Sequence, residues 1–171
     1  MPHMLTRAAL LALTLTPLWA AAAPPAPVEV ILSTTLEVKI DVSYGKAEAG
    51  LLRGSVTEAI RDALARGPAL SPAARSASIV VVIEDARPTH PTPRQLADDP
   101  SIDYLRSVAV GGAELTATVR AADGRVLATV SERHWPASLE LGSPAADDWA
   151  DARVAIRSLA AKVAEALRKS G

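Results

Sequence analysis

Residues 79–83 read IVVVI, an unbroken run of β-branched side chains near the middle of the chain. Such a run is typical of a buried strand, because β-branched side chains favour extended backbone and a strand covered on both faces shows no polar alternation. We therefore expect residues 79–83 to form a central strand that is covered on both faces. Its neighbours in the sheet must then come from the segments before and after it.

The segment before this strand alternates in polarity. Residues 34–43 read TTLEVKIDVS, in which apolar and polar side chains take turns. A period of two is the pattern of a strand with one buried face, so we expect one long strand over residues 28–43. We interpret residues 44–52 as a loop, because Gly45 and Gly50 interrupt them.

A helix is predicted after that loop. Ser55 and Glu58 have the spacing of a capping box, in which two side chains bind free backbone N–H groups at a helix start. Val56 and Ile60 then begin an apolar stripe, and the Gly-Pro pair at residues 67–68 ends the helix. A strand, a helix and a second strand form a right-handed crossover, so the first two strands should be parallel.

The second half of the chain predicts an antiparallel hairpin and a long helix. Residues 114–120 and 126–133 alternate in polarity on either side of Asp123-Gly124, which is a hairpin turn signal. The last helix opens near residue 143 or residue 147 and runs to about residue 169, with apolar side chains at helical spacing. We interpret Trp149 near its start as an anchor of the core.

These elements have the order β-α-β-β-β-α and predict an α+β fold class. The economical packing is a mixed four-stranded sheet with two helices packed on one face. A chain of 171 residues normally forms one such unit, and we expect residues 28–171 to be a single α+β domain.

The first 22 residues are predicted to be a secretory signal peptide. Arg7 supplies a positive charge, residues 8–18 are apolar, and residues 19–23 end in small side chains, which is the order of a signal peptide. The apolar run is about half of the roughly 20 residues that span a bilayer, so we expect no transmembrane segment in the mature chain. Cleavage before Ala23 would leave residues 23–27 as a Pro-rich leader and a periplasmic or secreted protein.

Composition excludes several classes of function. The chain has no cysteine, which rules out disulfides, thiolate metal sites, cysteine nucleophiles and a lipid anchor attached to a cysteine. Its formal net charge is −1, so we expect no basic surface for nucleic acid. Three Trp, two Tyr and no Phe are too few for a platform on which bases or sugars stack.

Known chemical motifs are also missing. The sequence contains no GxSxG elbow, no SxxK pair and no phosphate-binding loop, so we predict no catalytic, cofactor-binding or metal-binding residues and no cofactor. Glu132 and His134 fall on one face at the end of a predicted strand and could bind a metal or share a proton. A solvated strand end is the preferred interpretation, because no known metal-ligand spacing accompanies this pair.

Residues 84–112 are the best place to look for a binding site. This stretch is long for a connection in a compact domain, contains four prolines and lacks clear periodicity, and such loops are usually functional or mobile. Its arginines could hold a carboxylate or a phosphate, or could pair with aspartates of the same loop. The candidate recognition residues are Arg87, His90, Arg94, Gln95, Tyr104 and Arg106.

The order of elements, together with ADGRVLATV at residues 122–130 and DWADARVAIRSLAAKVAEAL at residues 148–167, resembles small bacterial envelope proteins of unknown function. Their fold is similar to the amino-terminal domain of TolB and to the lipopolysaccharide-assembly lipoprotein of the outer membrane. The resemblance implies a non-enzymatic periplasmic module that contacts a partner.

Two functions follow from these observations. The first is a non-enzymatic periplasmic binding or envelope-assembly module, whose partner is an envelope protein or a cell-surface component. The alternative is a small ligand-binding protein or an enzyme with its site in residues 84–112. A deep cavity lined by Arg87, His90, Arg94 and Tyr104 would favour the alternative, whereas a shallow loop packed on the sheet edge would favour the first.

Overall fold

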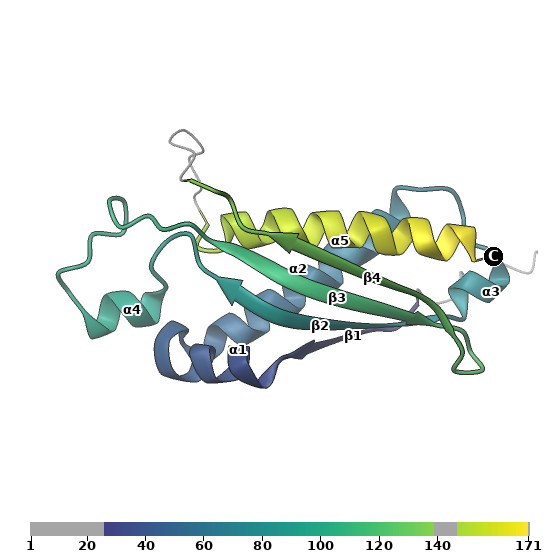
Figure 1. Cartoon of the computed structure of the whole chain (residues 1–171), viewed down its shortest axis with the longest axis horizontal. Helices are drawn as coiled ribbons and strands as arrows, with labels where there is room; N and C mark the ends of the chain where they lie inside the picture. Colours follow the sequence, from purple (N-terminus) through teal and green to yellow (C-terminus); the bar gives the residue numbers. More distant parts are fainter. Residues whose placement is uncertain (1–25, 139–146, 171) are drawn as a thin grey trace, which may run out of the picture.

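The computed structural model describes residues 26–138 and 147–170. One four-stranded sheet contains, in this order, β1 (Val28–Leu32), β2 (Ser78–Arg87), β3 (Gly112–Arg120) and β4 (Val126–His134) (Figure 1). β1 and β2 are parallel, whereas β3 is antiparallel to both β2 and β4. The predicted mixed sheet, its parallel first pair and its hairpin are confirmed. The signal peptide predicted at residues 1–22 lies outside the described residues.

Two long helices, α2 (Lys46–Ala65) and α5 (Ala150–Lys169), pack on one face of the sheet. α5 contacts β3 and β4, and α2 contacts α5 and β1, which confirms the predicted α+β packing. Trp149 is only 3% exposed, so its predicted role as a core anchor is confirmed. Its indole Nε1 donates a hydrogen bond of 2.7 Å to the buried carboxyl group of Glu48, and this bond joins the start of α5 to α2.

The predicted long strand over residues 28–43 is wrong in its second half. β1 ends early, and the chain continues as α1 (Thr34–Lys39) and one π-helical segment, η1 (Ile40–Tyr44). Ser33 caps α1, because its side-chain oxygen accepts a hydrogen bond of 3.1 Å from Leu36 N. Leu36 and Ile40 are one helical turn apart and both are buried, whereas Val38 is exposed. The helical period, and not the period of two, therefore decides which side chains enter the core.

The predicted loop over residues 44–52 and the capping box at Ser55 are also wrong. α2 begins directly after Gly45, whose φ of 103° suits glycine and separates α2 from η1. Ser55 therefore lies inside a helix that starts nearly three turns earlier than predicted. The buried side chains of α2 repeat every four residues. Because the first of them is a glutamate, the sequence shows no apolar stripe before Leu52. The buried residues are Glu48, Leu52, Val56 and Ile60.

The central strand is covered on one face only. Ile79, Val81 and Ile83 of β2 face the helices and are fully buried. Val80 and Val82 point to the opposite side, called the open face here, and are partly exposed, so the prediction of cover on both faces is wrong.

Two short helices complete the fold. α3 (Pro72–Arg75) lies before β2, and α4 (Pro93–Asp98) lies between β2 and β3. Across residues 26–138 and 147–170, no helix has the length and apolar character that crossing a membrane requires.

Candidate functional site

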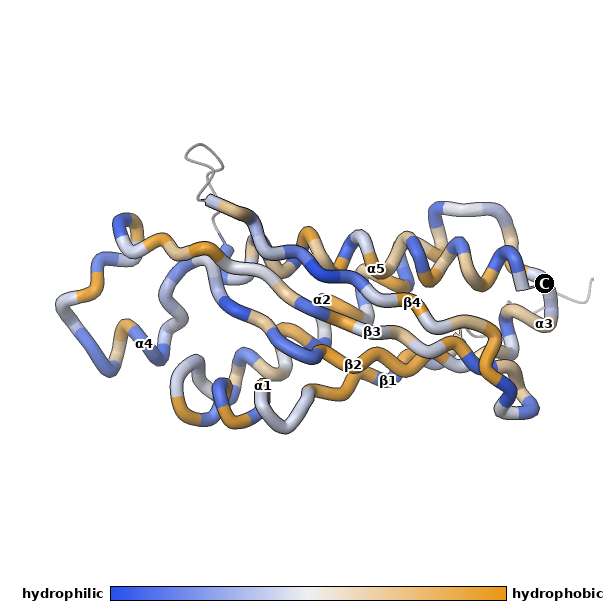
Figure 2. Tube along the Cα trace, in the orientation of Figure 1, coloured by the Kyte–Doolittle hydropathy of each residue, from blue (hydrophilic) through white to orange (hydrophobic). Residues whose placement is uncertain are grey.

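The connection between β2 and β3 forms an arm at one end of the molecule. Residues 88–111, called the arm here, include α4 and extend beyond the ends of the strands (Figure 1, left). Hydrophobic and hydrophilic residues are mixed along the arm (Figure 2). Because β2 continues to Arg87 and β3 begins at Gly112, the arm is shorter than the loop predicted over residues 84–112.

The two ends of the arm are attached to the segment that opens α5. Thr89 N donates to the Asp148 carbonyl oxygen at 2.6 Å, and Gly111 N donates to a carboxylate oxygen of Asp151 at 3.0 Å. Asp151 N in turn donates to Thr89 Oγ1 at 3.2 Å. These bonds satisfy buried backbone groups and give the arm a defined base.

His90 and Tyr104 are brought together inside the arm. Their rings stack with centroids 5.0 Å apart, and His90 Nδ1 lies 3.2 Å from the Tyr104 carbonyl oxygen. The Tyr104 hydroxyl donates to the Asp148 carboxylate at 2.7 Å. This bond favours the neutral phenol and raises the pKa of Tyr104 above its ordinary value. The contact braces the arm against the start of α5.

Gln95 helps to cap the amino-terminal end of α4. Thr92 and Gln95 form a capping box, in which Thr92 N donates to Gln95 Oε1 at 3.0 Å and Gln95 N donates to Thr92 Oγ1 at 3.4 Å. The fully buried Thr92 hydroxyl also donates to the Tyr44 carbonyl oxygen at 2.7 Å. α4 is thereby attached to η1.

The three candidate arginines lie apart. Arg94 Nε is 2.5 Å from the Asp98 carboxylate, and Arg106 Nε is 3.8 Å from the Asp103 carboxylate, so both pair with aspartates of the arm. Arg87 lies at the end of β2, next to the Trp135 ring. The structure therefore does not bring the three guanidinium groups to one anion.

A turn of the arm at residues 103–108, called the tip here, exposes apolar side chains that were not among the candidate residues. Leu105 is 77% exposed, and Val108, three residues later, is 36% exposed. The turn that carries Leu105 is held by its own hydrogen bonds, because Leu105 N and Arg106 N donate to Asp103 Oδ1 at 2.9 and 3.2 Å. An ordered turn thus directs a leucine away from the core.

A cavity of about 360 Å³ lies where the arm joins the sheet. The Arg87 guanidinium carbon is 5.4 Å from the centroid of the Trp135 ring, which is a cation–π distance. His90, Arg94 and Tyr104 do not line the cavity, so it is not the one that the sequence analysis described. The lining residues are Asp85, Arg87, Val110, Glu114, Arg133, Trp135 and Pro136.

Arg133 and Trp135 were not named from the sequence as candidate site residues, although the pattern of the hairpin places them on one face of the sheet. The register pairs Glu114 with Arg133, and the alternation of β4 then places Trp135 two positions further on the same face. Extending the predicted strand by two residues would have shown this.

Glu132 points to the other face of β4. Its carboxylate lies 2.6 Å from Lys162 Nζ, which chiefly lowers the pKa of Glu132, and it also accepts a hydrogen bond of 2.8 Å from Ser158. The carboxylate is thus bound by α5 and is not paired with His134. In the part of the chain that the structure describes, no three His, Asp or Glu side chains gather as a group that could hold a metal ion.

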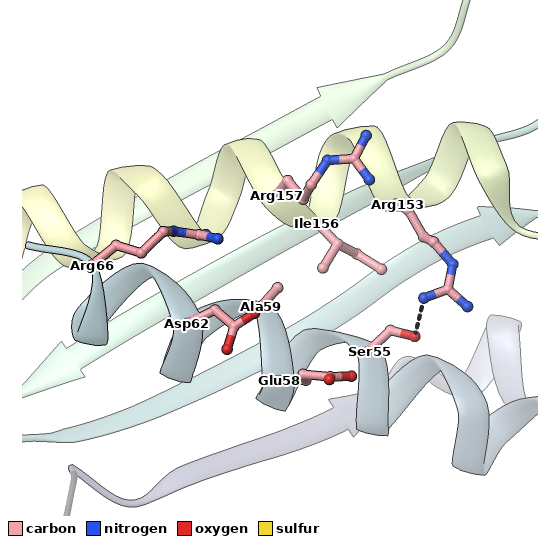
Figure 3. Close-up of a pocket in the computed structure, with 8 residues that line it drawn as sticks. All are labelled: Ser55, Glu58, Ala59, Asp62, Arg66, Arg153, Ile156 and Arg157. Carbon is pink, nitrogen blue, oxygen red and sulfur yellow. Dashed lines mark hydrogen bonds between the residues drawn. The ribbon is translucent and has the colours of Figure 1, made fainter. Parts of the chain in front are cut away.

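A smaller hollow of about 160 Å³ lies between α2 and α5 (Figure 3). Glu58 and Asp62 from α2 and Arg153 and Arg157 from α5 are among the residues that line it. Arg153 Nη1 donates to Ser55 Oγ at 3.2 Å, and the Arg153 guanidinium also pairs with Asp147. Arg153 therefore ties the two helices together, and we interpret this hollow as part of their interface.

A comparison with solved structures gives a distant likeness. No family model matches the chain, and no curated protein matches it. A crystal structure of protein XCC0632 from Xanthomonas campestris, described by the family model DUF330, is similar over 94% of this chain and 93% of that one. The two sequences are 14% identical and the TM-score is 0.44, so no property of that protein is carried over. The expected similarity to TolB and to the lipopolysaccharide-assembly lipoprotein is not confirmed.

Proposed function

We propose that this protein is an exported, non-enzymatic binding module that contacts an envelope partner through the tip of its arm. The observation that carries the proposal is the contrast between the base of the arm and its tip. The base is held by hydrogen bonds to the segment that opens α5, whereas the tip exposes Leu105 on an ordered turn. A binding loop on a rigid scaffold has this character, because ordering before binding lowers the entropy cost of association.

The chemistry of the tip favours a protein partner. Leu105 and Val108 supply an apolar centre, and the neighbouring Arg106–Asp103 pair supplies a polar rim, which is the usual anatomy of a protein interface. The arginines of the arm are paired with aspartates, so the arm lacks the excess positive charge that an anionic membrane surface would attract.

Binding is favoured over catalysis because the polar side chains of the arm are used in holding its shape. His90 and Tyr104 stack on each other, and Gln95 caps α4. Export is supported by the signal-peptide pattern at residues 1–22. Mass spectrometry of the protein from the periplasm should find an amino terminus at or near Ala23.

The test is site-specific photo-crosslinking in cells that produce the full chain. A crosslinker at Leu105 should capture a defined envelope protein, and Leu105→Glu should abolish capture of that protein by a crosslinker placed at Val108. Leu51 on α2 is the matched control, because it is also exposed, at 55%, but lies outside the arm. A crosslinker at Leu51 should not give the product, and Leu51→Glu should leave capture intact.

Both Glu variants should keep the melting temperature of the parent, because neither leucine belongs to the core. Equal capture from positions 105 and 51, or full capture by the Leu105→Glu variant, would contradict the proposal.

A further inference from the structure

The cavity at the base of the arm lies on the open face and is built from neighbouring strands. The sheet register places Asp85 of β2, Glu114 of β3 and Arg133 of β4 side by side. Arg87 is opposite Gly112 in the next row, and Trp135 follows the end of β4. Charged groups from three strands therefore meet around a single hollow of about 360 Å³.

Gly112 makes room for the aromatic wall of this cavity. Its φ is 148°, a conformation that favours glycine. A Cβ atom at this position would overlap the His134 carbonyl oxygen and lie 2.5 Å from Trp135 Cε3. The absence of a side chain thus lets the Trp135 ring approach the strand, where the Arg87 guanidinium lies against it.

The charges around the cavity leave Arg87 without an acidic partner. Asp85 is bound by Lys39 Nζ at 2.6 Å and accepts a hydrogen bond from Ala86 N at 2.9 Å. Arg133 Nε is 3.7 Å from Glu114, too far for a hydrogen bond. Over residues 26–138 and 147–170, no ion pair or hydrogen bond uses the Arg87 guanidinium.

We propose that this cavity binds a small organic or inorganic anion through a carboxylate or phosphate group, with Arg87 as the principal contact. The cation–π contact with Trp135 holds the guanidinium beside the ring, and no hydrogen bond among the described residues uses its N–H donors, so they can bind an anion in a bidentate manner. Arg133 is the second contact: its guanidinium leaves the 3.7 Å contact with Glu114 and binds the anion instead. The lining holds two arginines and two carboxylates. Lys39, from outside the lining, neutralises Asp85, so the charge of Arg87 is left for an anion.

The test follows the indole N–H resonance of Trp135 by NMR while the full chain is titrated with inorganic phosphate and, separately, with acetate. Sodium chloride at matched ionic strength is the salt control. We expect a saturable shift of the Trp135 resonance with at least one of the two anions, and no shift of the buried Trp149 resonance. The anion that binds more tightly identifies the recognised group as phosphate or carboxylate.

Arginine variants show whether the anion binds specifically at Arg87 or is attracted only by the charge of the protein surface. Arg87→Ala should weaken binding at least about tenfold, since it removes a charge-assisted hydrogen-bonding group. Arg87→Lys should also weaken it, because the charge remains but the fork is lost. Arg120→Ala removes an exposed arginine of β3 that does not line the cavity, and should leave affinity unchanged.

Failure to saturate with either anion, an equal shift with sodium chloride, or equal losses in Arg87→Ala and Arg120→Ala would overturn the inference. An unchanged melting temperature of Arg87→Ala shows that a loss of binding is not a loss of folding. The result does not depend on the proposed partner, because Leu105→Glu should bind the anion like the parent.

Discussion

Glu132 is a residue whose sequence context gives little hint of its partners. Its position at the end of a strand is typical of a solvated carboxylate, yet the side chain is only 16% exposed. Ser158 and Lys162 on α5 both bind it. A single carboxylate therefore connects the second strand of the hairpin to the closing helix.

This contact predicts a pH dependence of stability. The pKa of Glu132 in the folded protein lies below its ordinary value of 4.5, chiefly because Lys162 binds the charged form. The contribution is therefore complete above pH 4.5 and is lost as the pH falls through the folded pKa. Glu132→Gln should lower the free energy of unfolding by on the order of 1 kcal/mol at pH 7.

Urea unfolding of parent and variant at several pH values measures this difference, which should shrink as the pH falls below 4.5. Glu165→Gln is the control, because Glu165 pairs with Lys169 at an exposed position of α5 and its loss should cost much less than the loss of Glu132. A difference that grows on acidification would show that Glu132 is not held in its charged form.

The elements of the protein were predicted best where one local pattern has a single interpretation. The hairpin around Asp123-Gly124 and the closing helix are of this kind, and both exist. The helix begins at Ala150, after the predicted start near residue 147; the other predicted start, residue 143, lies outside the described residues. Residues 34–43 satisfy two patterns, since they alternate in polarity and also place Leu36 and Ile40 one helical turn apart. Ser33 resolves the choice, because its hydroxyl caps α1 and its backbone N donates to the Ile83 carbonyl oxygen at 2.9 Å.

The one-sided cover of β2 predicts different costs for neighbouring substitutions. Val81→Asp places a charge among fully buried side chains and should cost more than about 3 kcal/mol, or prevent folding. Val82→Asp places the same charge on the open face, where water reaches it, and should cost about 1 kcal/mol or less. Chemical denaturation of both variants measures the costs, and equal costs would mean that the open face is covered in solution.

The whole molecule consists of a packed sheet-and-helix body and an arm that extends from one end (Figure 1). The arm contributes little to the core but is attached at both ends to the segment that opens α5. Order in the arm therefore depends on contacts between residues that are far apart in the chain. Tyr104 is the clearest example, since its hydroxyl reaches Asp148.

Removal of that hydroxyl should loosen the arm without unfolding the body. Tyr104→Phe keeps the ring against His90 but loses the bond to Asp148, so amide hydrogens over residues 93–109 should exchange faster. Exchange in β2 and β3 should stay at the parent rate. Tyr44→Phe is the matched control, because no hydrogen bond within the described residues uses the Tyr44 hydroxyl. Unchanged exchange in the Tyr104→Phe arm would show that this bond does not order it.

The sequence by itself determined the α+β class, the central strand, the parallel first pair, the hairpin and the closing helix. Each depends on a period or a turn signal carried by residues within a few positions of one another. Only the tertiary structure decided the helical form of residues 34–43, the open face of the sheet and the partners of the arginines. These depend on contacts between distant segments, such as Arg87 with Trp135 and Tyr104 with Asp148, whose energies appear only once the chain has folded.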